Sequence, residues 1–93
     1  MERRFNVNLK NNKIDYDNLA DVLYLTFGRT SKNEELESIT ECDLVRFDKN
    51  SKRIIGITII GYFERFHIKP EYAFKKVVPD ILRKFETYMF GVV

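Results

Sequence analysis

A tight turn followed by a strongly β-prone run constrains the fold of this chain more than any other feature. Residues 17–27 read DNLADVLYLTF, and the second half of this stretch is rich in residues that favour strands. Successive side chains of a strand point to opposite faces, so Leu23 and Leu25 share one face while Val22 and Tyr24 share the other. Because both faces carry apolar groups, we expect a central strand against which the later segments pair or pack.

Alternation of polar and apolar residues predicts further strands. Residues 4–10, 14–17 and 44–48 carry an apolar side chain at every second position, which is the pattern of a half-buried strand. Residues 36–40 are polar enough for a short edge strand, and the turn-rich residues 28–35 predict an exposed loop. Turn-forming residues separate the early segments, so we expect the first third of the chain to form two linked hairpins.

Residues 53–60 read RIIGITII and are the strongest β segment, because β-branched side chains fit a pleated sheet better than a helix. Strict alternation predicts one face with Ile55, Ile57 and Ile59, and an opposite face with Ile54, Thr58 and Ile60. Gly56 leaves a gap on this opposite face, and we expect a large neighbour such as Tyr24 to fill it.

An amphipathic pattern predicts a helix over residues 70–89. Pro70 suits the first turn of a helix, where the missing N–H group is not needed. An apolar residue recurs every four positions and forms a stripe that faces a sheet: Ala73, Val77, Ile81 and Phe85. Pro79 removes a hydrogen bond within this pattern, so we expect the helix to kink or split there, with Pro79 and Asp80 opening its second part.

These segments together predict an α+β fold. We expect an antiparallel β-meander of four to five strands, with a C-terminal helix, kinked or split near Pro79, packed on one face. A chain of 93 residues has room for one hydrophobic core, so residues 1–93 are predicted to form a single domain. With one cysteine, Cys42, and no apolar run of the ~20 residues that span a bilayer, we expect a cytoplasmic protein without a membrane partner.

Two short motifs stand at a fixed separation in the first two thirds of the chain. They consist of Tyr16-Asp17, Ala20-Asp21, Leu23-Tyr24 and Phe27, and then of Arg53-Ile54-Ile55-Gly56-Ile57. Over residues 14–60 the chain thereby resembles a small prokaryotic family catalogued as domain of unknown function 2283. The resemblance implies a β-meander with a helix and implies no activity. Many members continue with Asp-Ala-Ser after the last strand, where this chain has Gly61-Tyr62-Phe63.

Three acidic residues, Asp15, Asp17 and Asp21, are the nearest approach to a metal site in the sequence. Hard cations need several oxygen ligands that converge on one point, and the spacing of an EF-hand loop is not present. We therefore expect these residues to cap the turn or to face solvent, and we predict no bound metal and no cofactor.

The sequence shows no residue combination typical of catalysis. His67 is the only histidine, and no nucleophile or orienting group stands at a suitable spacing from it. Cys42 lies between Glu41 and Asp43, an acidic setting that disfavours the reactive thiolate. The pattern favours a protein without catalytic residues, and enzymatic activity stays an open question at this point.

Basic residues beside aromatic ones suggest a nucleic-acid hypothesis. Arg3 and Arg4 precede Phe5, and Arg65 and Lys69 flank a second aromatic residue, so that cations would meet phosphates and rings would stack on bases. The net charge is only +2, and acidic residues interleave with the basic ones. A nucleic-acid-binding or antitoxin-like regulator is therefore the alternative function, with Arg3, Arg4, Arg65 and Lys69 as its candidate basic patch.

The favoured function is a non-catalytic protein-interaction module that self-associates. Tyr24, Ile54 and Ile60 are predicted on the sheet face that the helix does not cover, and this face is too apolar to stay exposed. Phe90 belongs to a C-terminal tail that is also apolar. We expect these four residues at the interface of a two-fold homodimer, and a further protein partner stays open.

Overall fold

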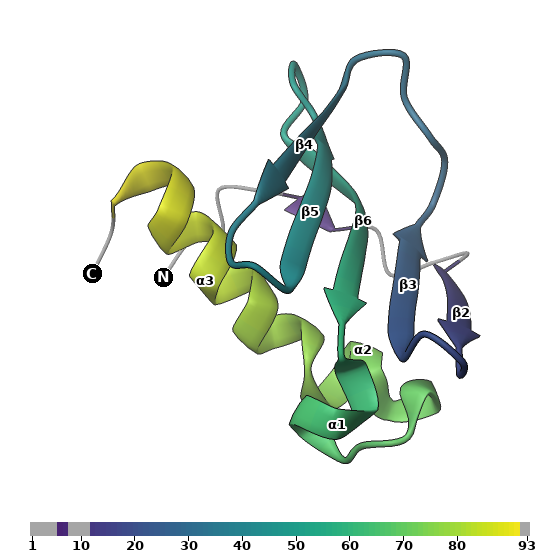
Figure 1. The fold of residues 1–93 in the computed structure, drawn as a ribbon. Coiled ribbons are helices and arrows are strands. Elements are labelled where there is room, and N and C mark those ends of the chain that lie inside the picture. The colour runs from purple at the N-terminus through teal and green to yellow at the C-terminus, as the bar shows by residue number, and fades with distance from the viewer. Residues whose placement is uncertain (1–5, 8–11, 92–93) are drawn as a thin grey trace.

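The computed structural model describes residues 6–7 and 12–91 of the chain. The strands are β1 (Asn6–Val7), β2 (Asn12–Asp17), β3 (Val22–Phe27), β4 (Glu34–Ser38), β5 (Asp43–Asp48) and β6 (Arg53–Ile60). The helical segments are α1 (Tyr62–Phe66), the 3-10 helix η1 (Pro70–Tyr72), α2 (Ala73–Lys76) and α3 (Val78–Phe90). One sheet with the helices gathered after it confirms the predicted α+β fold (Figure 1).

The strands form one sheet in the order β2-β3-β6-β5-β4, with antiparallel pairing between all of these neighbours. The loop after β3 crosses to the far edge, from which β4, β5 and β6 return as a meander (Figure 1). The two residues of β1 pair with β6 in parallel, with Asn6 opposite Arg53. Residues 4–10 were expected to form a hairpin with the next strand, so this pairing with β6 corrects that prediction for the two residues described.

The hydrophobic core lies between the sheet and α3. Leu23 and Leu25 of β3 and Val45 of β5 alternate with exposed or half-buried neighbours, so these strands each present one face to the core. The ring of Phe85 on α3 meets that of Phe47 at 5.4 Å between centroids. Burial of such large apolar groups on one side of the sheet holds α3 there and supplies most of the stabilisation.

A β-bulge in β6 reverses the side-chain alternation at one point. Phe47 pairs with Ile54 while the preceding Arg46 pairs with Gly56, so Ile55 has no counterpart on β5. Ile54 is therefore turned into the core beside Ile57, and it is fully buried. The prediction that Ile54 lies on the uncovered face with Ile60 is wrong, because strict alternation does not continue through the extra residue.

The gap at Gly56 is filled by Arg46 rather than by Tyr24, which corrects the expectation from the sequence. A Cβ atom at Gly56 would lie 2.6 Å from Arg46 Nη2 and 2.9 Å from the carbonyl oxygen of Leu25. Tyr24 lies further along the sheet and pairs with Thr58. The absence of a side chain at Gly56 thus leaves room for the guanidinium of Arg46 beside this position of β6.

The helical third splits before Pro79, as the sequence predicted. Pro70 opens η1, and α2 ends at Lys76, one residue before the boundary residue Val77. Pro79 stands in the first turn of α3, where its missing N–H group leaves no helical hydrogen bond unmade. In the described part of the chain, no helix combines the length and the apolar character that a membrane crossing requires.

Substitution of Gly56 by Ala tests this close packing. The added carbon would have to displace the backbone of Leu25 as well as the side chain of Arg46, so we expect a loss of about 2–3 kcal/mol in the free energy of unfolding. Urea denaturation followed by circular dichroism measures it. Gly91→Ala is the control: no atom lies within 4 Å of its added carbon, so only the left-handed backbone costs energy, about 1 kcal/mol. Equal losses in the two variants would contradict the explanation.

Candidate functional site

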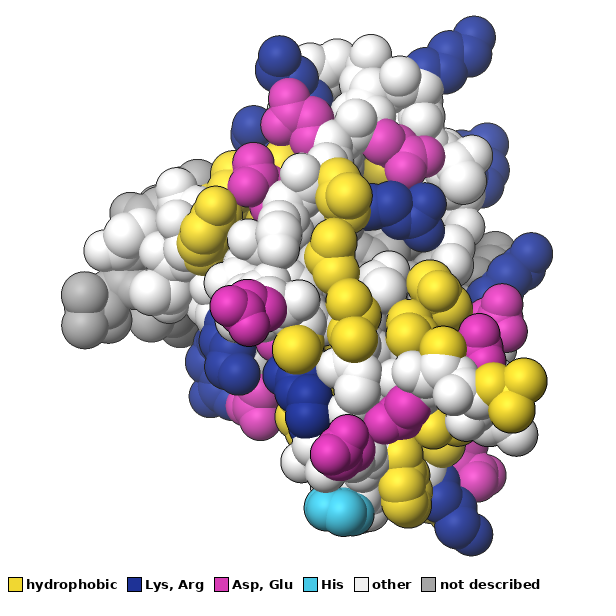
Figure 2. Space-filling model, viewed as in Figure 1, with side chains coloured by type: hydrophobic (Ala, Val, Ile, Leu, Met, Phe, Trp, Pro, Cys, Tyr) yellow, Lys and Arg dark blue, Asp and Glu magenta, His cyan; other side chains and the backbone are white. Residues whose placement is uncertain are grey.

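The sheet face that points away from α3 carries a band of apolar side chains, which we call the open face. The register places Val22 beside Ile60, and it places Tyr24 and Leu44 on either side of Thr58. Tyr24 is 44% exposed, Ile60 is 40% exposed, and Leu36 on β4 is 58% exposed. Figure 2 shows hydrophobic side chains gathered in a line down this side of the sheet. The open face consists of Val22, Tyr24, Leu36, Leu44 and Ile60.

Two of the four predicted interface residues, Tyr24 and Ile60, belong to the open face. Ile54 lies in the core because of the bulge, and the side chain of Phe90, the last residue of α3, is outside the described part of the chain. Leu36 was missed because β4 was expected as a polar edge strand. Its register opposite Arg46 places it on the open face. Whether these residues form an interface stays a prediction.

One carboxylate joins the turn before β3 to the start of α1. Asp21 accepts hydrogen bonds from the backbone N–H groups of Phe63 and Glu64, at 2.8 and 3.1 Å, and from the hydroxyl of Tyr16 at 2.6 Å. The first N–H groups of a helix have no helical partner, and Gly61 has no side chain that could supply an acceptor. Asp21 therefore caps α1 from 42 residues away in sequence.

The bond between Tyr16 and Asp21 shifts both pKa values away from neutrality. The hydroxyl of Tyr16, together with the backbone N–H groups, holds the pKa of Asp21 below its ordinary value. The same bond is the main cause that raises the pKa of Tyr16 to about 12. General acid–base catalysis needs a group that titrates near the working pH. This pair keeps fixed protonation states at neutral pH, which suits a structural bond.

A second carboxylate, which is buried, fixes α1 to β5. Asp43 is fully buried, and its two oxygens accept hydrogen bonds from Nη1 and Nη2 of Arg65 at 2.9 and 3.0 Å. The hydroxyl of Thr40 donates to the same carboxylate at 3.0 Å. The carboxylate of Asp43 raises the pKa of Arg65. Paired at two points and hydrogen-bonded to Thr40, the buried charge of Asp43 is fully compensated.

The candidate basic patch therefore loses one of its four residues, because Arg65 is paired with Asp43. Arg65 neutralises Asp43 and also donates to the carbonyl of Ile60 at 3.1 Å, so it presents no free charge. Lys69 is exposed immediately before η1. Arg3 and Arg4 lie outside the described residues. A nucleic-acid role for these remaining residues stays a prediction.

A third carboxylate holds the turn between β5 and β6. Asp48 accepts hydrogen bonds from the hydroxyl of Ser31 and from the backbone N–H of Ser51, the latter at 2.6 Å. These bonds, with that of Ser31 the stronger influence, lower the pKa of Asp48 to about 2. Arg53, at the start of β6, donates from Nη1 to the carbonyl of Phe27 at 3.2 Å. The loop after β3 is thereby attached to this hairpin.

The remaining sequence candidates do not come together. Asp17 accepts hydrogen bonds from the N–H groups of Leu19 and Ala20, and so caps the turn after β2, whereas Asp15 is exposed. His67 ends α1 with a left-handed backbone. Within residues 12–91, no group of three or more His, Cys, Asp or Glu side chains is arranged to hold a metal ion.

The polar residues of the two sequence motifs thus make bonds that hold the fold. They cap a helix, close a turn or bind a strand carbonyl: Tyr16, Asp17, Asp21 and Arg53. The hydroxyl of Tyr16 and the carboxylates of Asp17 and Asp21 serve the fold in this way, whereas Arg53 keeps N–H donors besides the one on Nη1. The open face, by contrast, offers a partner an apolar area.

Removal of the Asp21 carboxylate tests its capping role. Asp21→Ala leaves the first N–H groups of α1 and the hydroxyl of Tyr16 without their acceptor, so we expect the melting temperature to fall by about 5–10 °C. Thermal denaturation followed by circular dichroism measures it. Asp15→Ala removes an exposed carboxylate from the neighbouring strand and should shift the melting temperature by less than about 2 °C. An Asp21→Ala protein as stable as Asp15→Ala would refute the capping role.

Stability should decline at both ends of the pH scale. The unfolded chain protonates Asp48 near 3.8, whereas the folded protein keeps it ionised to about 2, so its stabilisation is lost as the pH falls through this range. The unfolded chain ionises Tyr16 near 10, and the folded protein only near 12, so stability also falls as the pH rises between these values. Urea midpoints across the pH range measure both slopes. Asp48→Asn should reduce the acid slope alone. Tyr16→Phe should reduce the alkaline slope and also part of the acid slope, because it removes the hydrogen bond that most lowers the pKa of Asp21.

Comparison with known proteins agrees with the resemblance seen in the sequence motifs. A family model described as protein of unknown function (DUF2283) matches residues 13–61, which is more than half of the 93-residue chain. The match covers β3 to β6 and nearly all of β2, and it ends just before α1. No curated protein and no solved structure matches the chain. The chain belongs to the DUF2283 family of proteins of unknown function.

Proposed function

We propose that this protein is a non-catalytic protein-interaction module that self-associates through its open face into a two-fold dimer. The observation that supports this proposal is the band of apolar side chains on the sheet face that α3 leaves uncovered (Figure 2). Removing such a band from water is favourable at about 25 cal/mol per Å² of apolar surface. A sheet with one covered and one apolar uncovered face is typical of an interaction surface.

The strands hold the band of apolar side chains in a fixed position, so the open face is a rigid recognition surface and not one that adapts to its partner. Val22 and Ile60 are paired in the register of two central strands, and Tyr24 stands beside Thr58 in the same pair of strands. A partner therefore meets a preformed surface and does not have to order it on binding. An aromatic side chain such as Tyr24 adds a large contact area at a low cost in conformational entropy.

The charges around the open face favour a second copy as the occupant. Lys13 and Arg46 contribute positive charge on this side of the sheet, and Asp15 and Asp17 contribute negative charge, as their registers with β3 and β6 place them. A partner of one strong charge would meet repulsion from one of these pairs. A two-fold interface uses the same surface twice, so a copy rotated by 180° presents both signs of charge and can set the basic residues of one protomer against the acidic residues of its partner.

Light scattering coupled to size-exclusion chromatography tests the dimer. At about 50 µM protein, a dissociation constant near 1 µM predicts a particle of twice the 11.1 kDa chain mass. Ile60→Lys and Tyr24→Lys place a charge in the centre of the open face, and we expect each variant to elute with the mass of one chain.

Leu19→Lys is the matched control. Leu19 is 96% exposed, but it lies in the turn between β2 and β3 and not on the open face, so this variant should remain dimeric. Circular dichroism checks that all three variants are folded. A wild-type protein that is monomeric at this concentration, or dimers that survive both Ile60→Lys and Tyr24→Lys, would remove the proposal.

A further inference from the structure

Positive charge is concentrated at the end of the sheet that contains the loop after β3 and the turn between β5 and β6. We call residues 28–35 and 46–53 the basic end. These sixteen residues include six Lys or Arg and three Asp or Glu, an excess of three positive charges, whereas the whole sequence has an excess of two. The two segments are joined by the hydrogen bond from the N–H of Lys49 to the carbonyl of Asn33 at 2.9 Å.

The acidic residues of the basic end are already engaged. Asp48 is 8% exposed and accepts hydrogen bonds from Ser31 and Ser51. Glu34 accepts from the N–H of Ser31 and pairs with Arg46 at 3.4 Å, and Glu35 pairs with Lys49 at 3.7 Å. The four remaining cations form no ion pair with a carboxylate among the described residues: Arg29, Lys32, Lys52 and Arg53.

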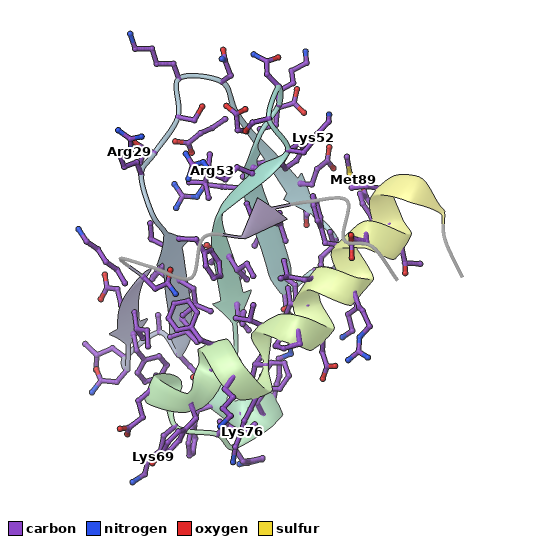
Figure 3. The ribbon with its side chains drawn as sticks, turned by 180° about the vertical axis from the view of Figure 1, so that it is seen from behind. Arg29, Lys52, Arg53, Lys69, Lys76 and Met89 are labelled. Atoms are coloured by element: carbon purple, nitrogen blue, oxygen red, sulfur yellow. The ribbon has the colours of Figure 1, made fainter. Side chains whose placement is uncertain are left out.

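Two of these cations belong to adjoining backbone segments. Arg53 is half-buried, and the bond from its Nη1 to the carbonyl of Phe27 fixes the guanidinium at the end of β3. Arg29 follows Phe27 by two residues, so its side chain starts within reach of the same place. Figure 3 shows Arg29, Arg53 and Lys52 at one end of the molecule, and Lys69 and Lys76 at the other. Guanidinium groups that approach each other at this end repel unless an anion lies between them.

We propose that the basic end binds a phosphate group through Arg29 and Arg53. A guanidinium presents planar pairs of N–H donors that match the oxygens of a phosphate, and the bond to Phe27 leaves other donors of Arg53 free for it. The only aromatic residue of the basic end, Phe47, is 1% exposed and does not offer a ring on which a base could stack. The basic end therefore recognises phosphate alone, which can come from a small molecule or from a nucleic-acid backbone. This proposal does not rest on the proposed dimer.

Fluorescence anisotropy with a labelled single-stranded oligonucleotide of about 12 nucleotides tests the backbone as the source. For two neutralised phosphates, the logarithm of the binding constant should fall with the logarithm of salt concentration with a slope of about −1.4. Arg29→Gln should weaken binding and reduce this slope by about 0.7. Pyrophosphate, followed by backbone and Arg side-chain NMR shifts, tests the small molecule as the source. The proposal is supported if either probe binds and Arg29→Gln weakens that binding. Comparing the oligonucleotide with pyrophosphate identifies the source of the phosphate.

The double variant Lys69→Gln/Lys76→Gln removes two exposed cations from the opposite end and should leave both readouts unchanged. Arg53→Lys keeps the charge but not the planar donor pairs, so it should weaken binding. Combining it with Arg29→Gln should weaken binding further. If Lys69→Gln/Lys76→Gln weakens binding as much as Arg29→Gln does, the effect comes from net charge in general, and the proposal is overturned. Absence of binding by both probes would overturn it as well.

Discussion

The position of the helices depends on the carboxylate of Asp21. Its carbonyl and its side chain together accept hydrogen bonds from the first three N–H groups of α1, those of Tyr62, Phe63 and Glu64. Because α1 follows β6 almost directly, its orientation decides where the chain leaves the sheet and from which side α3 approaches. The ion pair between Asp43 and Arg65 fixes the same helix to the other half of the sheet. The core thus closes over a short helix that is held by two carboxylates, one from the turn before β3 and one from β5.

Much of the fold was readable from local patterns. The alternation in β3 and β5 predicted which of their side chains share a face, because each position contributes to only one side of a strand. Pro79 predicted the split between α2 and α3, because a residue without an N–H group is tolerated only in the first turn of a helix. For the open face, the same alternation placed Tyr24 and Ile60 correctly, since both lie where the strand pairing is regular.

What the sequence did not reveal depends on contacts between distant residues. The bulge at Ile55 arises from the pairing of β5 with β6, and nothing in the run of isoleucines shows where the extra residue falls. Ile54 was assigned to the wrong face for this reason. The α1 helix was also missed, because its cap is supplied by Asp21 and not by a neighbouring residue. Likewise, Arg65 appeared to be a free cation until the fold brought it to Asp43.

The parallel pairing of β1 with β6 has a consequence for the order of folding. Asn6 and Val7 are synthesised before their partners, Arg53 and Ile54, which follow 47 positions later in the sequence. The β2–β3 hairpin can form earlier, since it needs only neighbouring residues. The order of synthesis is therefore not the order of assembly: Asn6 and Val7 are added to a sheet that later residues have built.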